Sequence, residues 1–301
     1  MTNFIFTFAG RKFTEEDMEH IKWARETYPN LSRTELAGTI CHIIDWLTPS
    51  GRAKVQQCSS LLEELEKEGF LDLPPKQVQA KRGKKQSEKP EESIEVDQTP
   101  VECDIRELAP ITLEIAYSGD SLKRWRHYVN QHHILQDKQV FGSRLQYFIK
   151  SGEIELGCMQ ISAAAWALEV RDCWIGWEKE HKENLHLLVN QNRFLIFPWV
   201  KVKNLASKAL SLLTRQVQKD WIREYGYAPV LLETFVDLSK FNGACYQAAN
   251  WKYLGQTKGT GRTEKKGVRL SRKAIYVYPL HRQFRSYLKG ELPYQVVDPD
   301  S

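Results

Sequence analysis

The strongest constraint on the fold is a strand–helix–strand pattern within residues 193–257. Residues 194–200 and 230–236 are apolar runs of strand length. Between them apolar residues recur at helical spacing, with Asn204 as a suitable N-cap and Gly226 as a suitable helix stop. Because a strand that returns through a helix to the same sheet runs parallel to the first, the pattern predicts two parallel neighbouring strands.

A short helix over residues 241–250 and a strand over residues 251–257 are expected to follow. This β–α–β–α–β order resembles the C-terminal half of a GNAT-type acyltransferase domain. The resemblance implies that the first helix receives the pyrophosphate of acyl-CoA, because free N–H groups and the dipole at a helix N-terminus favour anions. The corresponding loop, residues 201–207, contains no glycine, so neither acyl-CoA nor another cofactor is expected. Its cofactor-facing positions are Lys203, Asn204, Ala206 and Ser207.

The rest of this domain is predicted to occupy residues 105–290, followed by a tail over residues 291–301. A strand at residues 111–116, a helix at 122–131 and a hairpin of residues 144–149 with 156–161 lead into the central pattern. The fold class is therefore α+β or α/β, with a GNAT-like mixed sheet and flanking helices.

Residues 1–75 have the pattern of a helical module. Two capping boxes, at residues 14–17 and 32–35, open the first two helices, and a third helix is expected over residues 53–68. Residues 70–75 are expected to leave as a strand. Three helices and a strand predict a winged helix-turn-helix module that binds DNA, with a solvated helical interaction module as the alternative. The predicted groove-reading residues are Arg52, Lys54, Gln56 and Gln57.

Two further segments are defined by their charge. Residues 76–104 are polar and low in aromatics, which predicts a charged flexible linker. Residues 258–289 contain many lysines and arginines but a single acid, Glu264, and tyrosines lie among the basic residues. Such a composition indicates a nucleic-acid surface, with a solvated loop as the alternative. The predicted contacts are Lys258, Arg262, Lys265, Lys266, Arg269 and Arg272.

Four residues could carry chemistry: Asp172, Glu233, Asp237 and Cys245. An acid inside an apolar strand needs a partner, and either Arg171 or Arg193 could pair with Glu233. The acids therefore form either a structural ion pair, or a general base or divalent-metal ligand set at the carboxyl ends of the strands. Cys245 is either a buried thiol or, with its neighbouring tyrosine, a mimic of the acid-side tyrosine of an acyltransferase. No dedicated metal site is predicted, because histidine and cysteine are not clustered.

Several segments together resemble the uncharacterised family that contains the Druantia antiphage protein DruA. They are RDCWIGW (171–177), RFLIFPWVKVKNLAS (193–207), YGYAPVLLETFVD (225–237), GACYQAANWKYLGQTKGTGR (243–262) and KAIYVYPL (273–280), with the leading helical module. The resemblance implies a component of a multi-gene defence against bacteriophage and supplies no known reaction. Relatives occur beside or fused to transposases, which implies work on DNA.

No apolar run approaches the length of a membrane span, and the N-terminus lacks a signal-peptide pattern, so a cytoplasmic protein without membrane contact is expected. The predicted function is a DNA-binding component of a Druantia-type antiphage system, with DNA and other proteins of that system as partners. The alternatives are a GNAT-type acyltransferase acting on a macromolecule and a transposase-associated DNA-processing protein. The residues leave open whether the chain catalyses a reaction.

Overall fold

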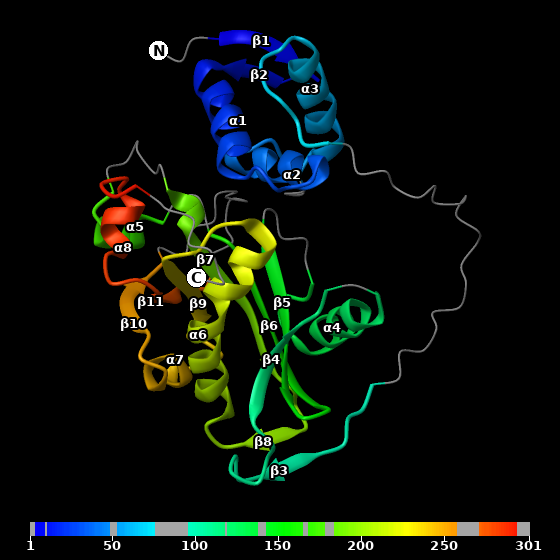
Figure 1. Ribbon diagram of the computed structural model, residues 1–301, viewed down its shortest axis with the longest axis vertical. Coiled ribbons are helices and arrows are strands. Elements are labelled where there is room, and N and C mark those ends of the chain that lie inside the picture. Colours follow the sequence, from blue (N-terminus) through cyan, green and yellow to red (C-terminus); the bar gives the residue numbers. More distant parts are fainter. Residues whose placement is uncertain are drawn as a thin grey trace, which may run out of the picture. The chain divides into compact units, whose positions relative to one another are not determined.

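The computed structural model describes residues 4–9, 11–48, 53–75, 96–117, 119–137, 143–164, 168–177, 184–257 and 271–293. The chain folds as two compact units (Figure 1). The first comprises Met1–Pro90 with Val140–Ser143, and the second comprises Glu91–Gln139 with Arg144–Ser301. Among the described residues, no helix is long and apolar enough to cross a lipid bilayer.

The N-terminal unit is a two-stranded hairpin followed by three helices. Its elements are β1 (Phe4–Phe8), β2 (Arg11–Thr14), α1 (Glu15–Thr27), α2 (Arg33–Ile43) and α3 (Val55–Lys67). Both predicted capping boxes are confirmed, with Thr14 capping α1 and Ser32 capping α2. The amphipathic faces of the helices bury a shared core that includes Phe13, Ile21, Leu36, Ile40 and Leu61.

The strand predicted after the third helix is wrong, because residues 71–75 form no strand. Side chains bind the backbone of this segment instead of a partner strand. Arg25 donates to the carbonyl oxygen of Asp72, Arg33 Nε donates to that of Pro74 at 2.6 Å, and the N–H of Leu73 donates to Glu66 Oε1 at 3.2 Å. The hairpin of this unit precedes α1, so within the described residues no wing follows the third helix.

The C-terminal unit is built on a seven-stranded mixed sheet with the order β10-β11-β9-β7-β6-β5-β4, which can be followed across Figure 1. Its strands are β4 (Ile111–Ile115), β5 (Arg144–Ser151), β6 (Ile154–Ala163), β7 (Leu188–Ile196), β9 (Leu231–Asp237), β10 (Lys252–Gln256) and β11 (Lys273–Pro279). All neighbours are antiparallel except β7 and β9, which are parallel as the sequence predicts. A separate parallel pair joins β3 (Val101–Cys103) to β8 (Val200–Val202).

The parallel pair β7 and β9 is joined only at its start. Leu188–Asn190 pairs with Leu231–Glu233, and beyond these residues the two strands diverge. The first strand of the predicted pattern thus begins six residues earlier than expected and ends at Ile196. Residues 190–193 lie within this strand and are polar, so a search for apolar runs does not detect the first half of the strand. These polar residues become the centre of the site described below.

Helices cover both faces of the sheet. They are α4 (Gly119–His132), α5 (Glu169–Ile175), the 3-10 turn η1 (Leu185–Leu187), α6 (Leu205–Tyr225), α7 (Ala244–Ala248) and α8 (Phe284–Leu288). The Tyr147 hydroxyl donates to Asp220 of α6 at 3.0 Å, whereas the adjacent Phe148 meets Tyr128 of α4, with ring centroids 6.3 Å apart. Successive residues of a strand point to opposite faces, so α6 and α4 lie on opposite sides. We call the side that carries α6 the α6 face. The opposite side carries α4 and also α5, because Arg171 of α5 binds Glu233 there, and we call it the α5 face.

Candidate functional site

Buried polar side chains form two adjoining rows on the α5 face of the sheet, and we call them the polar rows. The first row is Gln146, Gln160 and Arg193, which oppose one another on β5, β6 and β7. The second row is Ser162, Asn190 and Glu233, opposed in the same way on β6, β7 and β9. Residues opposite one another across a ladder point to the same face, so the six side chains share one surface. None is more than 6% exposed.

A bulge in β7 brings a further amide to the polar rows. Gln160 opposes Arg193 and Ile161 opposes Gln191, which leaves Asn192 as the extra residue. Asn192 Oδ1 accepts from Gln160 Nε2 at 2.9 Å, and Asn192 Nδ2 donates to Ser162 Oγ at 2.7 Å. The bulge therefore ties the two rows together through one carboxamide.

The charged end of the polar rows is an ion pair that confirms Arg171 as the partner of Glu233. Arg171 Nη1 donates to Glu233 Oε2 at 3.0 Å, Arg171 Nε donates to Asp172 Oδ1 at 2.8 Å, and Asn190 Nδ2 donates to Glu233 Oε1 at 3.2 Å. Burial opposes the charge of Arg171, yet the carboxylates of Glu233 and Asp172 outweigh it and raise the pKa of the guanidinium. Asp172 also accepts the N–H of Leu168 at 3.1 Å and so fixes the start of α5.

The other two chemical candidates lie apart from this pair. Asp237, at the end of β9, accepts from the N–H and hydroxyl of Ser239 and from the hydroxyl of Ser271, and these bonds lower the pKa of its carboxyl group. Cys245 lies on α7, and burial raises the pKa of its thiol. The structure thus brings Asp172 and Glu233 together and leaves Asp237 and Cys245 elsewhere.

Sequence reasoning missed most of the polar rows. Gln146, Gln160 and Asn190 each keep one polar atom without a hydrogen-bond partner among the described residues. An unsatisfied buried group of this kind costs about 1–3 kcal/mol. The available signal was the run Asn190-Gln191-Asn192-Arg193, which places polar side chains in the central strand of a buried sheet.

On the α6 face, the point where β7 and β9 diverge is filled by a hydrogen-bonded group. The Tyr246 hydroxyl donates to Gln191 Oε1 at 2.7 Å, and Thr234 Oγ1 donates to the carbonyl oxygen of Gln191 at 2.8 Å. Burial raises the pKa of Tyr246, so its hydroxyl remains protonated at neutral pH. Side chains of this chain therefore occupy the start of the opening between the strands.

The loop before α6 forms without glycine. Asn204 adopts a left-handed backbone with φ of 65°, a conformation that asparagine tolerates better than most residues. Lys203 is exposed, Ala206 and Ser207 are half-buried in the first turn of α6, and the Ser207 hydroxyl donates to the Asn204 carbonyl oxygen at 3.0 Å. The remaining first-turn N–H groups have no intrahelical acceptor, as at any helix start.

The predicted nucleic-acid contacts are described only in part. Arg52, Lys258, Arg262, Lys265, Lys266 and Arg269 lie outside the described residues. Lys54 immediately precedes α3, and Gln56 and Gln57 are exposed in its first turn. Arg272 is exposed just before β11.

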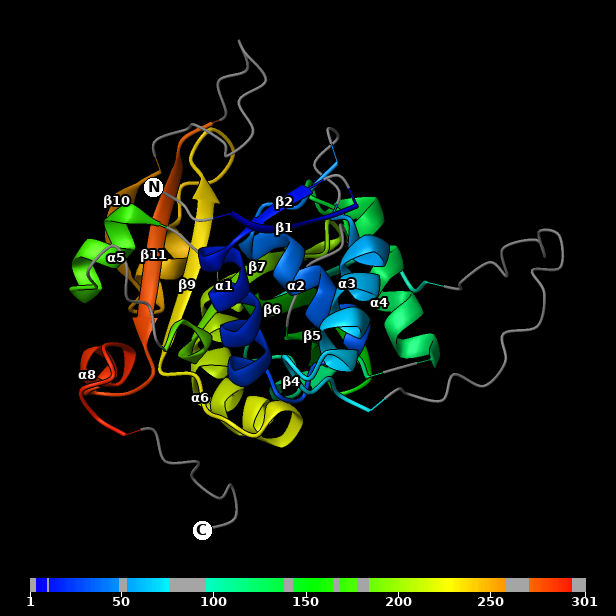
Figure 2. The ribbon, with the colours of Figure 1, turned by 90° about the horizontal axis from the view of Figure 1, so that it is seen from above.

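A cluster of cations and aromatic rings, which we call the Trp174 cluster, lies where α5, β10 and α8 meet. The Arg285 guanidinium lies 4.4 Å and Lys252 Nζ 5.3 Å from the centroid of the Trp174 ring, which stacks on Phe284 at 5.2 Å. Both cations are exposed, and neither has a carboxylate partner among the described residues. Figure 2 shows α5 beside β10. The cluster thus presents positive charge on an aromatic support.

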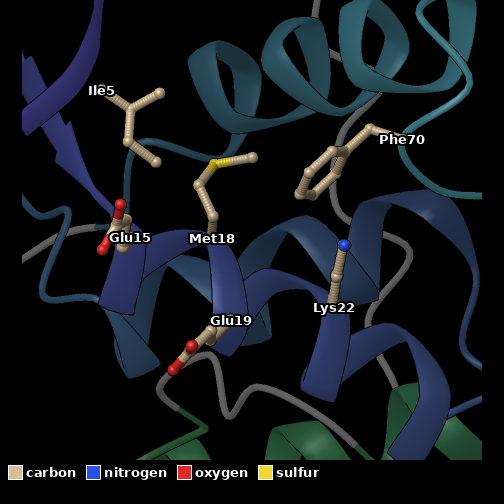
Figure 3. Close-up of a pocket in the computed structure, with 6 residues that line it drawn as sticks. All are labelled: Ile5, Glu15, Met18, Glu19, Lys22 and Phe70. Carbon is tan, nitrogen blue, oxygen red and sulfur yellow. The ribbon is translucent and has the colours of Figure 1, made fainter.

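The N-terminal unit has a shallow hollow, shown in Figure 3 and lined by Ile5, Glu15, Met18, Glu19, Lys22 and Phe70. Lys22 Nζ lies 4.1 Å from the centroid of the Phe70 ring, so its charge is already held by an aromatic face. Across the described residues, no group of three histidine, cysteine or acidic side chains could hold a metal ion.

One family model, that of Druantia protein DruA, matches residues 64–269, which is more than half of the chain. The chain belongs to the DruA family. The DruA match begins within α3 and includes both polar rows, β9 and β10. No curated protein sequence matches the chain.

Solved acetyltransferases are similar to part of this DruA family member. Aminoglycoside acetyltransferase AAC(6')-Ib in complex with coenzyme A and kanamycin has 16% identity and a TM-score of 0.37, with 59% of this chain and 98% of that chain covered. An N-acetyltransferase from Staphylococcus aureus Mu50 has 13% identity and a TM-score of 0.34, with 57% and 99% covered. A Bacillus subtilis acetyltransferase in complex with CoA has 8% identity and a TM-score of 0.35, with 56% and 99% covered.

Proposed function

We propose that this member of the DruA family is a component of a Druantia-type antiphage system and that it acts by binding DNA. The family match carries the first half of the proposal. Other proteins of the same system are its expected partners. The direct test is the efficiency with which phage form plaques on cells carrying the complete system, with and without this chain. Equal plaque counts in both strains would contradict a role in defence.

The Trp174 cluster is the observation that supports DNA binding. Lys252 and Arg285 carry exposed positive charge with no carboxylate partner among the described residues, and the charge rests on Trp174. Basic side chains attract phosphate, and aromatic rings support bases by stacking. The chain continues from β10 into the basic segment of residues 258–270, whose charge is of the same sign.

Charge reversal tests this surface. The double variant Lys252→Glu with Arg285→Glu should weaken binding to single- and double-stranded oligonucleotides about tenfold or more in a fluorescence anisotropy titration. The slope of log affinity against log salt should become shallower by about 2 for duplex DNA, because two phosphate contacts are lost. The matched control is Lys208→Glu with Arg215→Glu, which reverses two exposed cations of α6. Equal effects of the two pairs would remove the Trp174 cluster from the interface.

The first turn of α3 is a second proposed contact. Gln56 and Gln57 are exposed there, and amide side chains can pair with base edges in the major groove. Lys54→Glu combined with Gln56→Glu should weaken duplex binding. An unchanged duplex affinity would exclude the N-terminal unit from DNA contact.

Acyl transfer to a macromolecule is a second candidate, favoured by the backbone of Asn204. With a φ of 65°, Asn204 takes a left-handed backbone that glycine usually supplies, and the N–H groups that follow it at the start of α6 are available to a phosphate. Ala206, with its small side chain, would allow a pyrophosphate to approach, whereas Tyr246 limits the space between β7 and β9. Micromolar binding of acetyl-CoA in a calorimetric titration, lost in Ala206→Asp, would place this candidate first.

A further inference from the structure

Three hydrogen-bonding atoms without partners among the described residues lie together in the polar rows. They are Gln146 Nε2, Gln160 Oε1 and Asn190 Oδ1, on side chains that are 6%, 0% and 6% exposed. Gln146 opposes Gln160 directly, and Asn190 opposes Ser162, two residues further along β6. Protein interiors pair almost all buried polar atoms with protein, water or ligand. One free donor and two free acceptors in neighbouring positions therefore indicate a binding partner with the complementary groups.

Arg193 adds to the same surface a positive charge that forms no ion pair with a carboxylate of the described residues. The residue is 6% exposed, and its hydrogen bonds run from Nε to the carbonyl oxygen of Gln136 at 2.7 Å and from Nη1 to that of Asn192 at 2.8 Å. A guanidinium has five N–H donors, so two carbonyl oxygens satisfy it only in part. Burial lowers the pKa of its guanidinium, and the carboxylate of Asp137, which pairs with Arg126, offsets this effect only in part.

Arg171 provides an internal comparison for this charge. It is completely buried, and it is paired with Glu233 at 3.0 Å and with Asp172 at 2.6 Å. The chain thus pairs one guanidinium of this face directly with two of its own carboxylates, whereas the other contacts two carbonyl oxygens and receives only the charge of Asp137 without an ion pair. A buried charge is retained at low cost only when it is paired, so Arg193 favours an anion from outside the chain.

We propose that the polar rows bind a nucleotide, with Arg193 on its phosphate and the amide groups of Gln146, Gln160 and Asn190 on its base. A guanidinium matches phosphate geometry with paired N–H groups. Glutamine and asparagine amides pair with the donor and acceptor edges of bases, as in pockets that receive a base outside the stack. Neighbouring strands lie about 4.8 Å apart, so the first row spans about 10 Å from β5 to β7.

The nucleotide can come from two sources. It is either a free mononucleotide or a single residue of a DNA strand, and both present the same phosphate and base. The polar rows lie between α4 and α5, whose positions at β5 and β10 are visible in Figure 2. The proposal does not depend on the Trp174 cluster, so loss of surface DNA binding would leave it standing.

The first experiment is a calorimetric titration of the full chain with the four deoxynucleoside 5′-monophosphates, the matching deoxynucleosides and inorganic phosphate. At least one monophosphate is expected to bind more tightly than both its nucleoside and inorganic phosphate. Inorganic phosphate that binds as tightly as every nucleotide would show that the amides read no base, and would overturn the proposal. Absence of binding by all four nucleotides at millimolar concentration would overturn it as well.

The second experiment uses Arg193→Met, with the same substitution at exposed Arg215 of α6 as the control. Arg193→Met should weaken binding of the preferred nucleotide about tenfold or more, the loss expected when a charged hydrogen-bonded contact is removed. Gln160→Met should weaken nucleotide binding and leave inorganic phosphate unaffected. A thermal melt checks that each variant folds. If Arg193→Met does not fold, Arg193→Lys replaces it, because lysine keeps the positive charge and lacks the paired N–H groups of the guanidinium. Unchanged nucleotide affinity in folded Arg193 and Gln160 variants would contradict the proposal.

A titration with a short single-stranded oligonucleotide, performed on Lys252→Glu with Arg285→Glu, separates the two sources. If Arg193→Met weakens the remaining oligonucleotide affinity together with mononucleotide affinity, the bound nucleotide belongs to DNA. If only mononucleotide binding falls, the site takes a free nucleotide. If neither falls, the polar rows hold no nucleotide.

Discussion

Arg171 Nη1 lies 3.0 Å from Glu233 Oε2, and both side chains are completely buried between α5 and β9. Glu233 stands inside a mostly apolar strand, and Asn190 of the neighbouring strand donates to its second oxygen at 3.2 Å. Taking both charges out of water costs several kcal/mol per ion, so this arrangement depends on all of its partners being present.

Removal of one member should therefore destabilise the C-terminal unit strongly. Glu233→Gln removes one of the two carboxylates that Arg171 binds, and Arg171→Met removes the cation bound to Glu233. Each should lower the free energy of unfolding by about 3–5 kcal/mol, measured by urea denaturation. Lys123→Met, which breaks an exposed pair with Asp120, is the control and should have little effect. A double variant Arg171→Met with Glu233→Met should be less destabilised than either single variant, and the reverse order would contradict this account.

Local signals predicted most of the fold. The caps Thr14 and Ser32 and the stop Gly226 mark helix ends within one residue, because each acts on its own first or last turn. Asn204 also stands at the predicted N-cap position, but its side chain makes no capping hydrogen bond. The parallel pair followed from the strand–helix–strand order alone. The predicted strand after α3 failed because Arg25 and Arg33, forty or more residues away, bind its carbonyl groups, and no local pattern carries that information.

Only the ion pair of the candidate site was predictable from the sequence. The need of Glu233 for a cation follows from one sequence position, and Arg171 was one of two named partners. The first row depends on which residues of β5, β6 and β7 oppose one another, and a one-residue bulge at Asn192 sets that register. Without the register, Gln146, Gln160 and Arg193 are three unrelated residues far apart in sequence.

The effect of substituting Asn204 on stability should depend on the conformational freedom of the new residue. Its φ of 65° is costly for a residue with an ordinary β-carbon, so Asn204→Ala should destabilise the chain by about 1 kcal/mol. Asn204→Gly should be close to neutral, since glycine adopts this backbone freely. Urea denaturation measures both. Equal stability of the alanine and glycine variants would show that the left-handed turn is absent in solution.

Two partly buried histidines should make the chain less stable in acid. Burial and the charge of Arg193 lower the pKa of His133 to about 4, and burial lowers that of His186 to about 4. A folded-state pKa below the unfolded value of about 6.5 means that stability is complete above pH 6.5 and falls as the pH drops towards 4. Each histidine should contribute a loss of about 1–2 kcal/mol between pH 7 and pH 5. His186→Gln should flatten the dependence of stability on pH relative to the parent chain, and parallel curves would show that His186 does not have a lowered pKa in the folded chain.

Cys245 should react slowly with alkylating reagents at neutral pH. All six cysteines lie among the described residues as free thiols, and Cys173 is exposed on α5. Burial raises the pKa of Cys245, and because the thiolate is the nucleophile, its alkylation rate should rise only at higher pH. Peptide mapping after iodoacetamide treatment of the folded chain should find Cys173 modified first at pH 7, with Cys245 following as the pH is raised. Rapid modification of Cys245 at pH 7 would instead indicate an activated thiol on α7, and would make it a candidate nucleophile again.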